Sequence, residues 1–232
     1  MTVRDKVILV TGAGRGIGAA ICRRLAQDGA RVVAAARTTA ELDALTEELR
    51  PFRDDCLAVP TDLSKPADIA RLAETVRREV GRLDVLINNA GIAWGKPTAE
   101  VTLEEWRQLL AVNLDAVFLL TRECLPIFQA QGSGQIVNLG SDASLRGISG
   151  TACYCASKFA LRGFTMALRE ELKGAGIRLN LVMPGPVNTT ICGGAADRWD
   201  LIQPEAVAEV VHQVIALPPT ADVWEVLVEP GA

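Results

Sequence analysis

The most regular feature of the chain is an alternation of short apolar runs with longer stretches in which apolar residues recur at helical spacing. The short runs are rich in β-branched residues and favour strands, whereas the longer stretches favour helices. Strands are predicted at 6–11, 30–36, 56–61, 84–90, 135–141, 177–183 and 224–229. Helices are predicted at 16–28, 38–50, 65–80, 102–130, 153–173 and 204–216.

The predicted strands are apolar along almost their whole length. Such strands are buried on both faces, which is typical of a parallel sheet between two layers of helices. Seven strands joined by right-handed crossovers predict an α/β fold, with a single doubly wound Rossmann-fold domain over 1–232 and a seven-stranded parallel sheet. Another parallel strand order, such as the flavodoxin-like one, stays open on pattern alone.

One long segment, 185–203, lacks this pattern and is rich in glycine. It follows the predicted strand 177–183. Ligands of doubly wound sheets bind outside the carboxyl ends of the strands, so we predict that this segment is the substrate loop.

The composition is that of a soluble globular protein, because 49% of the 232 residues are hydrophobic and 22% are charged. The formal net charge of −4 gives no reason to expect nucleic acid or an anionic membrane surface as a partner. No apolar run reaches membrane-spanning length, and the first run leads straight into a glycine loop, so we predict a strand there and not a signal peptide. We expect a cytoplasmic protein.

The cysteines and the histidine restrict the possible chemistry. The six cysteines form no CxxC pair and have no histidine close to them in sequence, so we predict no metal site and reduced thiols. His212 is the only histidine, and a Ser-His-Asp hydrolase would depend on it alone.

A glycine-rich turn joins the first predicted strand to the first predicted helix. Its sequence is Thr11-Gly12-Ala13-Gly14-Arg15-Gly16-Ile17-Gly18. Glycines let such a turn adopt positive φ and approach a phosphate closely, and the helix that follows offers free N–H groups to a pyrophosphate. A purely structural tight turn would also use glycines, but the position between strand and helix favours a dinucleotide-binding loop.

The end of the second strand bears on the choice of nicotinamide cofactor. NAD-specific folds place an Asp or Glu about 20 residues beyond the glycine loop. Here no acid occurs before Glu41, and Arg37 follows the strand instead. Arg37 and Arg15 could both pair with a 2′-phosphate, so we predict NADP(H) in preference to NAD(H).

Tyr154 and Lys158 stand four residues apart in a predicted helix, which places both side chains on one face. A tyrosine with its usual pKa of about 10 is a poor base at neutral pH. A lysine ammonium, together with the positive ring of an oxidised nicotinamide, would favour the phenolate and make Tyr154 a usable acid–base group. Taken alone, the pair could also be a half-buried aromatic residue beside a surface lysine.

In their order and spacing, the motifs resemble those of the short-chain dehydrogenase/reductase family in its classical form, over nearly the whole chain. Ser141 precedes Tyr154 by 13 residues, the interval that the family uses. The matching segments are TGAGRGIG at 11–18, Asp62 after the third strand, NNAG at 88–91, Asn113, Ser141, YCASK at 154–158 and PGPVNT at 184–189.

The resemblance implies a role for each catalytic residue. Tyr154 gives a proton to the substrate oxygen as hydride arrives from the nicotinamide, and Ser141 hydrogen-bonds that oxygen. Lys158 binds the nicotinamide ribose and lowers the pKa of Tyr154, and Asn113 holds a water that links Lys158 to solvent. The implied cofactor contacts, with Asp62 and Leu63 at the adenine, are Gly12, Arg15, Gly16, Ile17, Gly18, Arg37, Asp62, Leu63, Asn89, Ala90, Gly91, Tyr154, Lys158, Pro184, Gly185, Val187 and Thr189.

The chain departs from the family pattern in two places. Gly140 precedes Ser141 where many members have a second serine, and the chain ends VWEVLVEPGA without the Gly-Gly ending common in reductases of fatty-acid synthesis. The family also implies a homodimer or homotetramer, formed through the predicted helices at 102–130 and 153–173.

The substrate is the least determined part of the prediction. Arg146 is a candidate for binding an anionic group, and segments that could line the pocket contain Trp94, Leu145, Ile148, Ile191 and Trp199. These side chains favour an apolar or aromatic carbonyl compound. The leading hypothesis is reduction of a ketone, an aldehyde or a 3-oxoacyl group to an alcohol. The alternatives are an NAD-linked alcohol or sugar dehydrogenase and a non-catalytic dinucleotide-sensing regulator.

Overall fold

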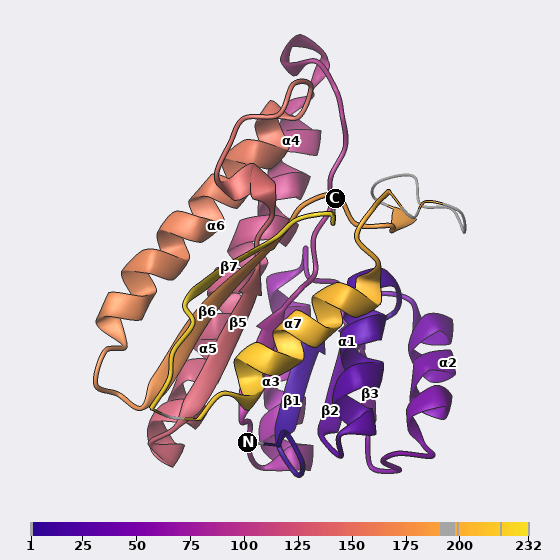
Figure 1. Cartoon of the computed structure of the whole chain (residues 1–232), viewed down its shortest axis with the longest axis vertical. Coiled ribbons are helices and arrows are strands. Elements are labelled where there is room, and N and C mark those ends of the chain that lie inside the picture. Colours follow the sequence, from indigo (N-terminus) through magenta and orange to yellow (C-terminus); the bar gives the residue numbers. More distant parts are fainter. Residues whose placement is uncertain (1, 191–197, 199, 219, 232) are drawn as a thin grey trace.

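The computed structural model describes residues 2–190, 198, 200–218 and 220–231. Its strands form a seven-stranded sheet in the order β3-β2-β1-β4-β5-β6-β7, and all neighbouring strands are parallel (Figure 1). This order confirms the doubly wound Rossmann fold and excludes the flavodoxin-like order. The strands are β1 Val7–Thr11, β2 Arg31–Ala36, β3 Leu57–Pro60, β4 Val85–Asn88, β5 Gly134–Leu139, β6 Ile177–Pro184 and β7 Glu225–Val228.

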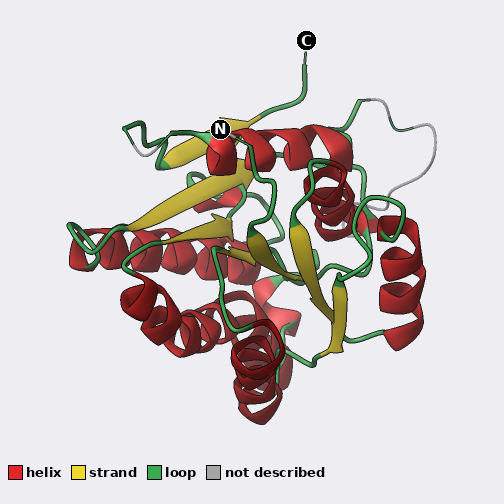
Figure 2. Ribbon diagram, turned by 90° about the horizontal axis from the view of Figure 1, so that it is seen from below, coloured by secondary structure: helices red, strands yellow, loops and turns green. Residues whose placement is uncertain are grey.

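Helices cover both faces of the sheet (Figure 2). They are α1 Gly16–Gln27, α2 Thr39–Leu49, α3 Pro66–Thr75, α4 Leu103–Leu110, α5 Ala116–Gln131, α6 Ala152–Glu171 and α7 Pro204–Ala216. Short turns of other helix types are η1 Val76–Val80, η2 Thr98–Glu100, η3 Ala111–Asp115 and η4 Asp142–Ser144. Among the described residues, no helix is long and apolar enough to cross a membrane.

The two helix layers follow from the alternation of side chains along each strand. In β1, Ile8 and Val10 belong to a core that includes residues of α1, α2 and α7. Val7 and Leu9, on the other face of the same strand, belong to a core that includes residues of α3, α5 and α6. Every second residue of a strand points to the same face, so an uninterrupted apolar run supplies both cores at once.

Several predicted elements differ from the observed ones, and the predicted helix 65–80 ends in the π-helical turn η1. The predicted helix 102–130 is divided, because the π-helical turn η3 separates α4 from α5. A π-helical turn inserts extra backbone into a helix and often occurs at functional sites. The predicted strand 84–90 ends at Asn88, so that Asn89 and Ala90 leave the sheet.

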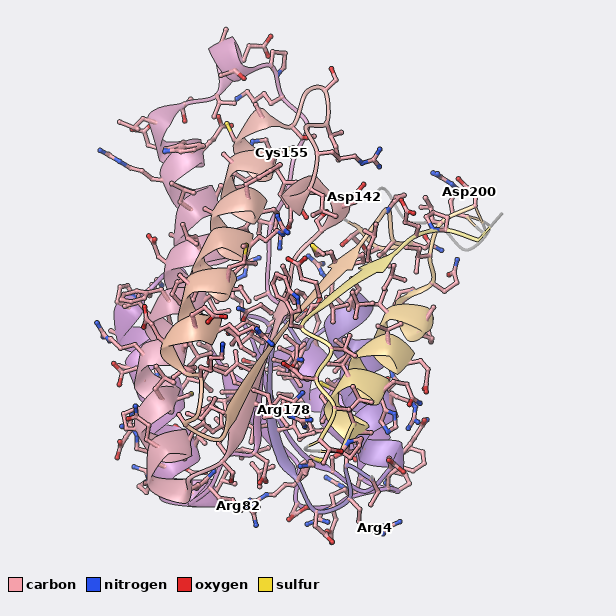
Figure 3. All side chains as sticks on the ribbon, turned by 60° about the vertical axis from the view of Figure 1, so that its left-hand side comes forward. Arg4, Arg82, Asp142, Cys155, Arg178 and Asp200 are labelled. Atoms are coloured by element: carbon pink, nitrogen blue, oxygen red, sulfur yellow. The ribbon has the colours of Figure 1, made fainter. Side chains whose placement is uncertain are left out.

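The strand order opens a place for a ligand at the carboxyl ends of the strands. β1 lies between β2 and β4, so the chain must cross from β3 over the sheet to begin β4. Connections that leave neighbouring strands in opposite directions open a crevice at the carboxyl ends of those strands. Figure 3 shows Asp142, which follows β5, toward this end of the molecule and Arg82, which precedes β4, toward the other.

Candidate active site

A cleft of about 860 Å³ lies at the carboxyl ends of the strands. Of the catalytic and cofactor-binding residues predicted from sequence, Asn113 is the one that is not in its lining. The predicted residues that line the cleft are Gly12, Arg15, Gly16, Ile17, Gly18, Arg37, Asp62, Leu63, Asn89, Ala90, Gly91, Ser141, Tyr154, Lys158, Pro184, Gly185, Val187 and Thr189. The structure therefore brings together segments that lie more than a hundred residues apart in the sequence.

The glycine loop needs its glycines for two different reasons. Gly12 and Gly16 have φ angles of 64° and 56°, which side chains rarely tolerate. Gly18 lies in the first turn of α1, and a Cβ added there would overlap the carbonyl oxygen of Gly12. The absence of a side chain at Gly18 therefore lets the helix start directly against the loop.

Thr11 connects the ends of β1 and β4. Its hydroxyl donates to the carbonyl of Ile87 at 3.3 Å and accepts from the N–H groups of Asn89 and Ala90, both at 3.1 Å. The side chain of Asn89 returns a hydrogen bond to the carbonyl of Thr11 at 2.8 Å. These bonds hold the chain after β4 against the glycine loop, a role for Thr11 that the sequence did not indicate.

The part of the cleft next to β2 carries two arginines. Arg37 is exposed and forms no side-chain hydrogen bond or ion pair with any described residue. Nη1 of Arg15 lies 3.8 Å from Oε1 of Glu41, and both side chains are partly exposed. An exposed ion pair at this distance contributes little to stability, so Arg15 and Arg37 both remain available to an anionic ligand.

Asp62 shapes the turn after β3. Its Oδ1 atom accepts hydrogen bonds from the backbone N–H of Ser64 at 3.1 Å and from the Ser64 hydroxyl at 2.7 Å. The hydroxyl bond is the main cause that lowers the pKa of Asp62 below its usual value. The carboxylate thus closes the turn that presents Leu63 to the cleft.

Tyr154 and Lys158 lie one turn apart on α6, as their spacing predicted. Nζ of Lys158 is 5.7 Å from the centre of the Tyr154 ring. The same nitrogen donates to the carbonyl of Leu139, at the end of β5, over 2.8 Å. Burial lowers the pKa of Lys158 to about 8.

Asn113 lies behind the cleft in η3 and joins three parts of the chain. Its side chain accepts a hydrogen bond from the N–H of Ile92 and donates to the carbonyl of the same residue, both at 2.9 Å. It also donates to the hydroxyl of Ser157 at 3.1 Å, and Ser157 in turn donates to the carbonyl of Tyr154 at 2.7 Å. Asn113 therefore fixes the segment after β4 relative to α6.

Ser141 follows β5, and its hydroxyl is already engaged. It donates to Oδ1 of Asp142 at 2.9 Å and accepts from the N–H of Ala143 at 3.2 Å. The other carboxylate oxygen of Asp142 accepts from Nε and Nη2 of Arg146 at 3.2 and 2.6 Å. Asp142 and Arg146 both line the cleft.

The comparison with protein families decides the identity of the chain. The model described as short chain dehydrogenase matches residues 6–198. The chain belongs to the short-chain dehydrogenase/reductase family. The family resemblance predicted from the motifs is thereby confirmed, and the chain is an oxidoreductase.

Named relatives of this short-chain dehydrogenase/reductase span most or all of its length. An uncharacterized oxidoreductase of Staphylococcus saprophyticus is 33% identical over 242 residues, which cover 99% of this chain and 98% of the relative. The ketoacyl reductase HetN of Nostoc sp. is 37% identical over 189 residues, which cover 82% of this chain and 66% of the relative.

Two solved structures share the fold over nearly the whole chain. A metagenomic short-chain oxidoreductase in complex with NADP has a TM-score of 0.88 and 37% identity, and the match covers 100% of both chains. The alcohol dehydrogenase from the archaeon Thermococcus sibiricus, complexed with 5-hydroxy-NADP, has a TM-score of 0.91 and 29% identity, with 97% of this chain and 96% of that chain covered.

In this short-chain dehydrogenase/reductase, only some of the residues predicted to line the substrate pocket lie in the cleft. Trp94, Ile148 and Arg146 line the cleft. Leu145 is exposed and is not part of the lining. Ile191 and Trp199 lie outside the described residues.

Asp142 is the main residue that the sequence reasoning missed. The motif that matches the family contains Ser141, at its 13-residue spacing from Tyr154, but not the residue that follows it. The signal that could have found it is the pair Asp142 and Arg146, which have the i, i+4 spacing of an ion pair directly after a predicted catalytic residue.

Proposed function

We propose that this enzyme uses NADP(H) to reduce a carbonyl group, in a ketone, an aldehyde or a 3-oxoacyl compound, to an alcohol. The observation that carries the proposal is that Ser141, Tyr154 and Lys158 line the same cleft as the glycine loop and two arginines. The Nostoc relative supports it, because that protein is named a ketoacyl reductase.

The residues at the glycine loop fit a dinucleotide. A Cβ at Gly12 would lie 2.9 Å from the Cα atom of Ala90, so the backbone of the two loops is in close contact without any side chain between them. The N-terminal turn of α1 begins at Gly16 and directs free N–H groups toward the cleft. A pyrophosphate is the chemical group that such a turn binds best.

The preference for NADP(H) rests on the two arginines beside β2. A 2′-phosphate is a dianion that pairs well with planar guanidinium groups. Arg37 has no competing partner among the described residues, and Arg15 has only the long contact to Glu41. The two structural neighbours described above, which are complexes with NADP and an NADP derivative, support the same cofactor.

The catalytic residues act on the substrate oxygen. When bound, NADPH supplies the hydride that adds to the carbonyl carbon. Negative charge then develops on the carbonyl oxygen, and Tyr154 donates its phenolic proton to that atom. The charged amine of Lys158, held by Leu139 at the end of β5, stabilises the phenolate that remains. The hydrogen bonds of Asn113 to Ile92 and Ser157 fix the position of α6 relative to the segment after β4.

Steady-state kinetics test this function. The purified enzyme is mixed with NADPH or NADH and a panel of ketones, aldehydes and 3-oxoacyl thioesters, and loss of the reduced cofactor is followed. We expect turnover with at least one class and a higher kcat/KM with NADPH. A higher kcat/KM with NADH would contradict the cofactor assignment. Tight cofactor binding without turnover across the whole panel would contradict the enzymatic role and favour a sensor.

The buried Lys158 predicts a pH dependence. Its amine is charged below a pKa of about 8 and becomes neutral as the pH rises through that value. The positive charge is what supports the phenolate, so kcat/KM for NADPH, which reports the free enzyme, should fall as the pH rises above about 8. In Lys158→Arg the cation does not titrate in this range, so any residual activity should lose that decline. A decline unchanged in Lys158→Arg would show that another group causes it.

The outer face of α5 and α6 indicates an oligomer. Phe118 on α5 and Phe159 and Met166 on α6 are exposed apolar side chains of neighbouring helices. Phe118 stacks edge-to-face on Phe164, with ring centres 6.2 Å apart, so the patch continues across both helices. Exposed apolar surface of this kind marks interfaces, and our proposal is that a second copy covers it in a homodimer or homotetramer. Analytical ultracentrifugation should give twice or four times the chain mass, and a monomer at micromolar concentration would contradict it.

A further inference from the structure

An acidic side chain lies at the part of the cleft to which we assign the 2′-phosphate. Glu41 is in the first turn of α2 and lines the cleft together with Arg15 and Arg37. Its side chain packs over the glycine loop, since a Cβ added to Gly14 would lie 2.6 Å from Oε2 of Glu41. The other carboxylate oxygen, Oε1, lies 3.8 Å from Nη1 of Arg15. Glu41 therefore places a negative charge beside the arginines.

The contact between Glu41 and Arg15 is too long and too exposed to hold Arg15 in one orientation. The Arg15 side chain is 64% exposed and that of Glu41 is 35% exposed, and such pairs contribute little to stability. Glu41 also favours the start of α2, because an acidic residue in the first turn interacts well with the positive end of a helix. Stabilisation of α2 is therefore the alternative role of Glu41.

A 2′-phosphate bound to Arg15 would lie close to the Glu41 carboxylate. A phosphate oxygen that accepts from Nη1 of Arg15 at about 2.8 Å would lie within about 7 Å of Oε1 of Glu41. This separation is shorter than the Debye length of about 10 Å at about 0.1 M salt, so the two negative groups repel each other. For a carboxylate and a phosphate dianion about 7 Å apart in water, the repulsion weakens binding about fivefold.

Asp62 also lines this part of the cleft, but its carboxylate has partners of its own. Oδ1 accepts two hydrogen bonds from Ser64, and Oδ2 lies 3.4 Å from Nζ of Lys65. The positive charge of Lys65 compensates part of the negative charge of Asp62. Glu41 differs because its carboxylate lies next to Arg15, where a bound phosphate would meet it.

We propose that Glu41 sets the cofactor selectivity of the enzyme by opposing the 2′-phosphate. Arg15 and Arg37 favour NADP(H), and the Glu41 carboxylate reduces that preference. The enzyme then prefers NADPH by a smaller factor than its arginines alone would give, and NADH remains a usable cofactor. This inference rests on the proposed function and concerns the choice of cofactor at the same site.

Two adenosine nucleotides that differ only in the 2′-phosphate test the inference without catalysis. Adenosine 2′,5′-bisphosphate carries this group, and AMP lacks it. Calorimetry gives the Kd of each for the unmodified enzyme and for Glu41→Gln, which keeps the size of the side chain and removes its charge. The selectivity, defined as the Kd for AMP divided by the Kd for the bisphosphate, should rise about fivefold in the variant. The ratio of kcat/KM for NADPH to kcat/KM for NADH should rise by the same factor.

Salt and a control variant separate charge from packing. At about 1 M sodium chloride the Debye length is about 3 Å, so the selectivities of the unmodified enzyme and of Glu41→Gln should become nearly equal. A role confined to the stability of α2 would change thermal unfolding and leave the selectivity unaltered at both salt concentrations. Glu48→Gln removes the same charge two turns farther along α2, outside the cleft lining, and should not change the selectivity.

The outcomes are distinct. A selectivity above one that Glu41→Gln leaves unaltered overturns the inference alone, and so does an increase that persists at the higher salt concentration. A selectivity of one or less in both proteins overturns the proposed preference for NADP(H) together with the inference. If circular dichroism shows that Glu41→Gln does not fold, Glu41→Ala also removes the charge, and its selectivity should rise by the same factor.

Discussion

Replacing Tyr154 with phenylalanine should lower kcat for carbonyl reduction by about 10²–10⁴-fold, the range that a positioned proton donor contributes. The variant keeps the ring on α6 and removes only the hydroxyl that protonates the substrate oxygen. The Kd for NADPH, measured by calorimetry, should change little, because the glycine loop and the arginines that line the cleft are untouched.

Two controls make this result specific for the hydroxyl of Tyr154. Thermal unfolding should show that Tyr154→Phe retains the stability of the unmodified enzyme to within a few degrees. Phe52→Tyr introduces a hydroxyl at an exposed position outside the cleft and should not restore activity in the Tyr154→Phe background. Turnover close to the unmodified rate in Tyr154→Phe would show that another group protonates the substrate.

Much of the fold was predictable because it depends on features that repeat along the sequence. The central strands of this sheet are buried on both sides and appear as apolar runs, as with Ile8 and Val10 on one face of β1 and Val7 and Leu9 on the other. Similarly, the glycine loop was visible because its glycines follow a strand and begin a helix. These signals are local, and one sequence is sufficient to read them.

The parts that were not predicted depend on contacts between distant segments. Thr11 is one threonine at the end of a strand, and only the placement of β4 beside β1 shows that its hydroxyl meets Asn89 and Ala90. The π-helical turn at Asn113 also has no sequence pattern of its own. The Asn113 side chain forms hydrogen bonds with Ile92 and Ser157, which come from other parts of the chain. Contacts of this kind require the register of the sheet, which hydrophobic periodicity does not supply.

Asp142 shows a different limit of motif reasoning. A motif directs attention to the residues that it contains, and Ser141 belongs to one while Asp142 does not. Asp142 follows Ser141 directly in the sequence, but only the structure shows that its carboxylate lies 2.9 Å from the Ser141 hydroxyl. The motif therefore indicated which hydroxyl lines the cleft, and the structure showed which carboxylate lies beside it.

Gly18→Ala should weaken NADPH binding by about 100-fold, since a displacement of about 1 Å in a binding element has effects of that size. The added Cβ would overlap the Gly12 carbonyl oxygen and lie 2.6 Å from Nδ2 of Asn89. Neither atom can yield easily, because Gly12 has a φ of 64° and Nδ2 of Asn89 donates to the Thr11 carbonyl at 2.8 Å. The start of α1 must therefore move away from the loop, and overpacking of this kind also costs about 1–3 kcal/mol of stability.

Gly163→Ala is the matched control for this change. Gly163 lies within α6, and a Cβ built there meets no atom within 4 Å. Gly163 is not part of the cleft lining, so this variant should bind NADPH with an unchanged Kd. Calorimetry compares the Kd for NADPH of the two variants. An equal Kd would show that the pyrophosphate site does not depend on the close approach of α1 to the glycine loop. The opposite pattern, weak binding only when the methyl group is placed at Gly18, would show that NADPH binding depends on the close approach of α1 to the glycine loop.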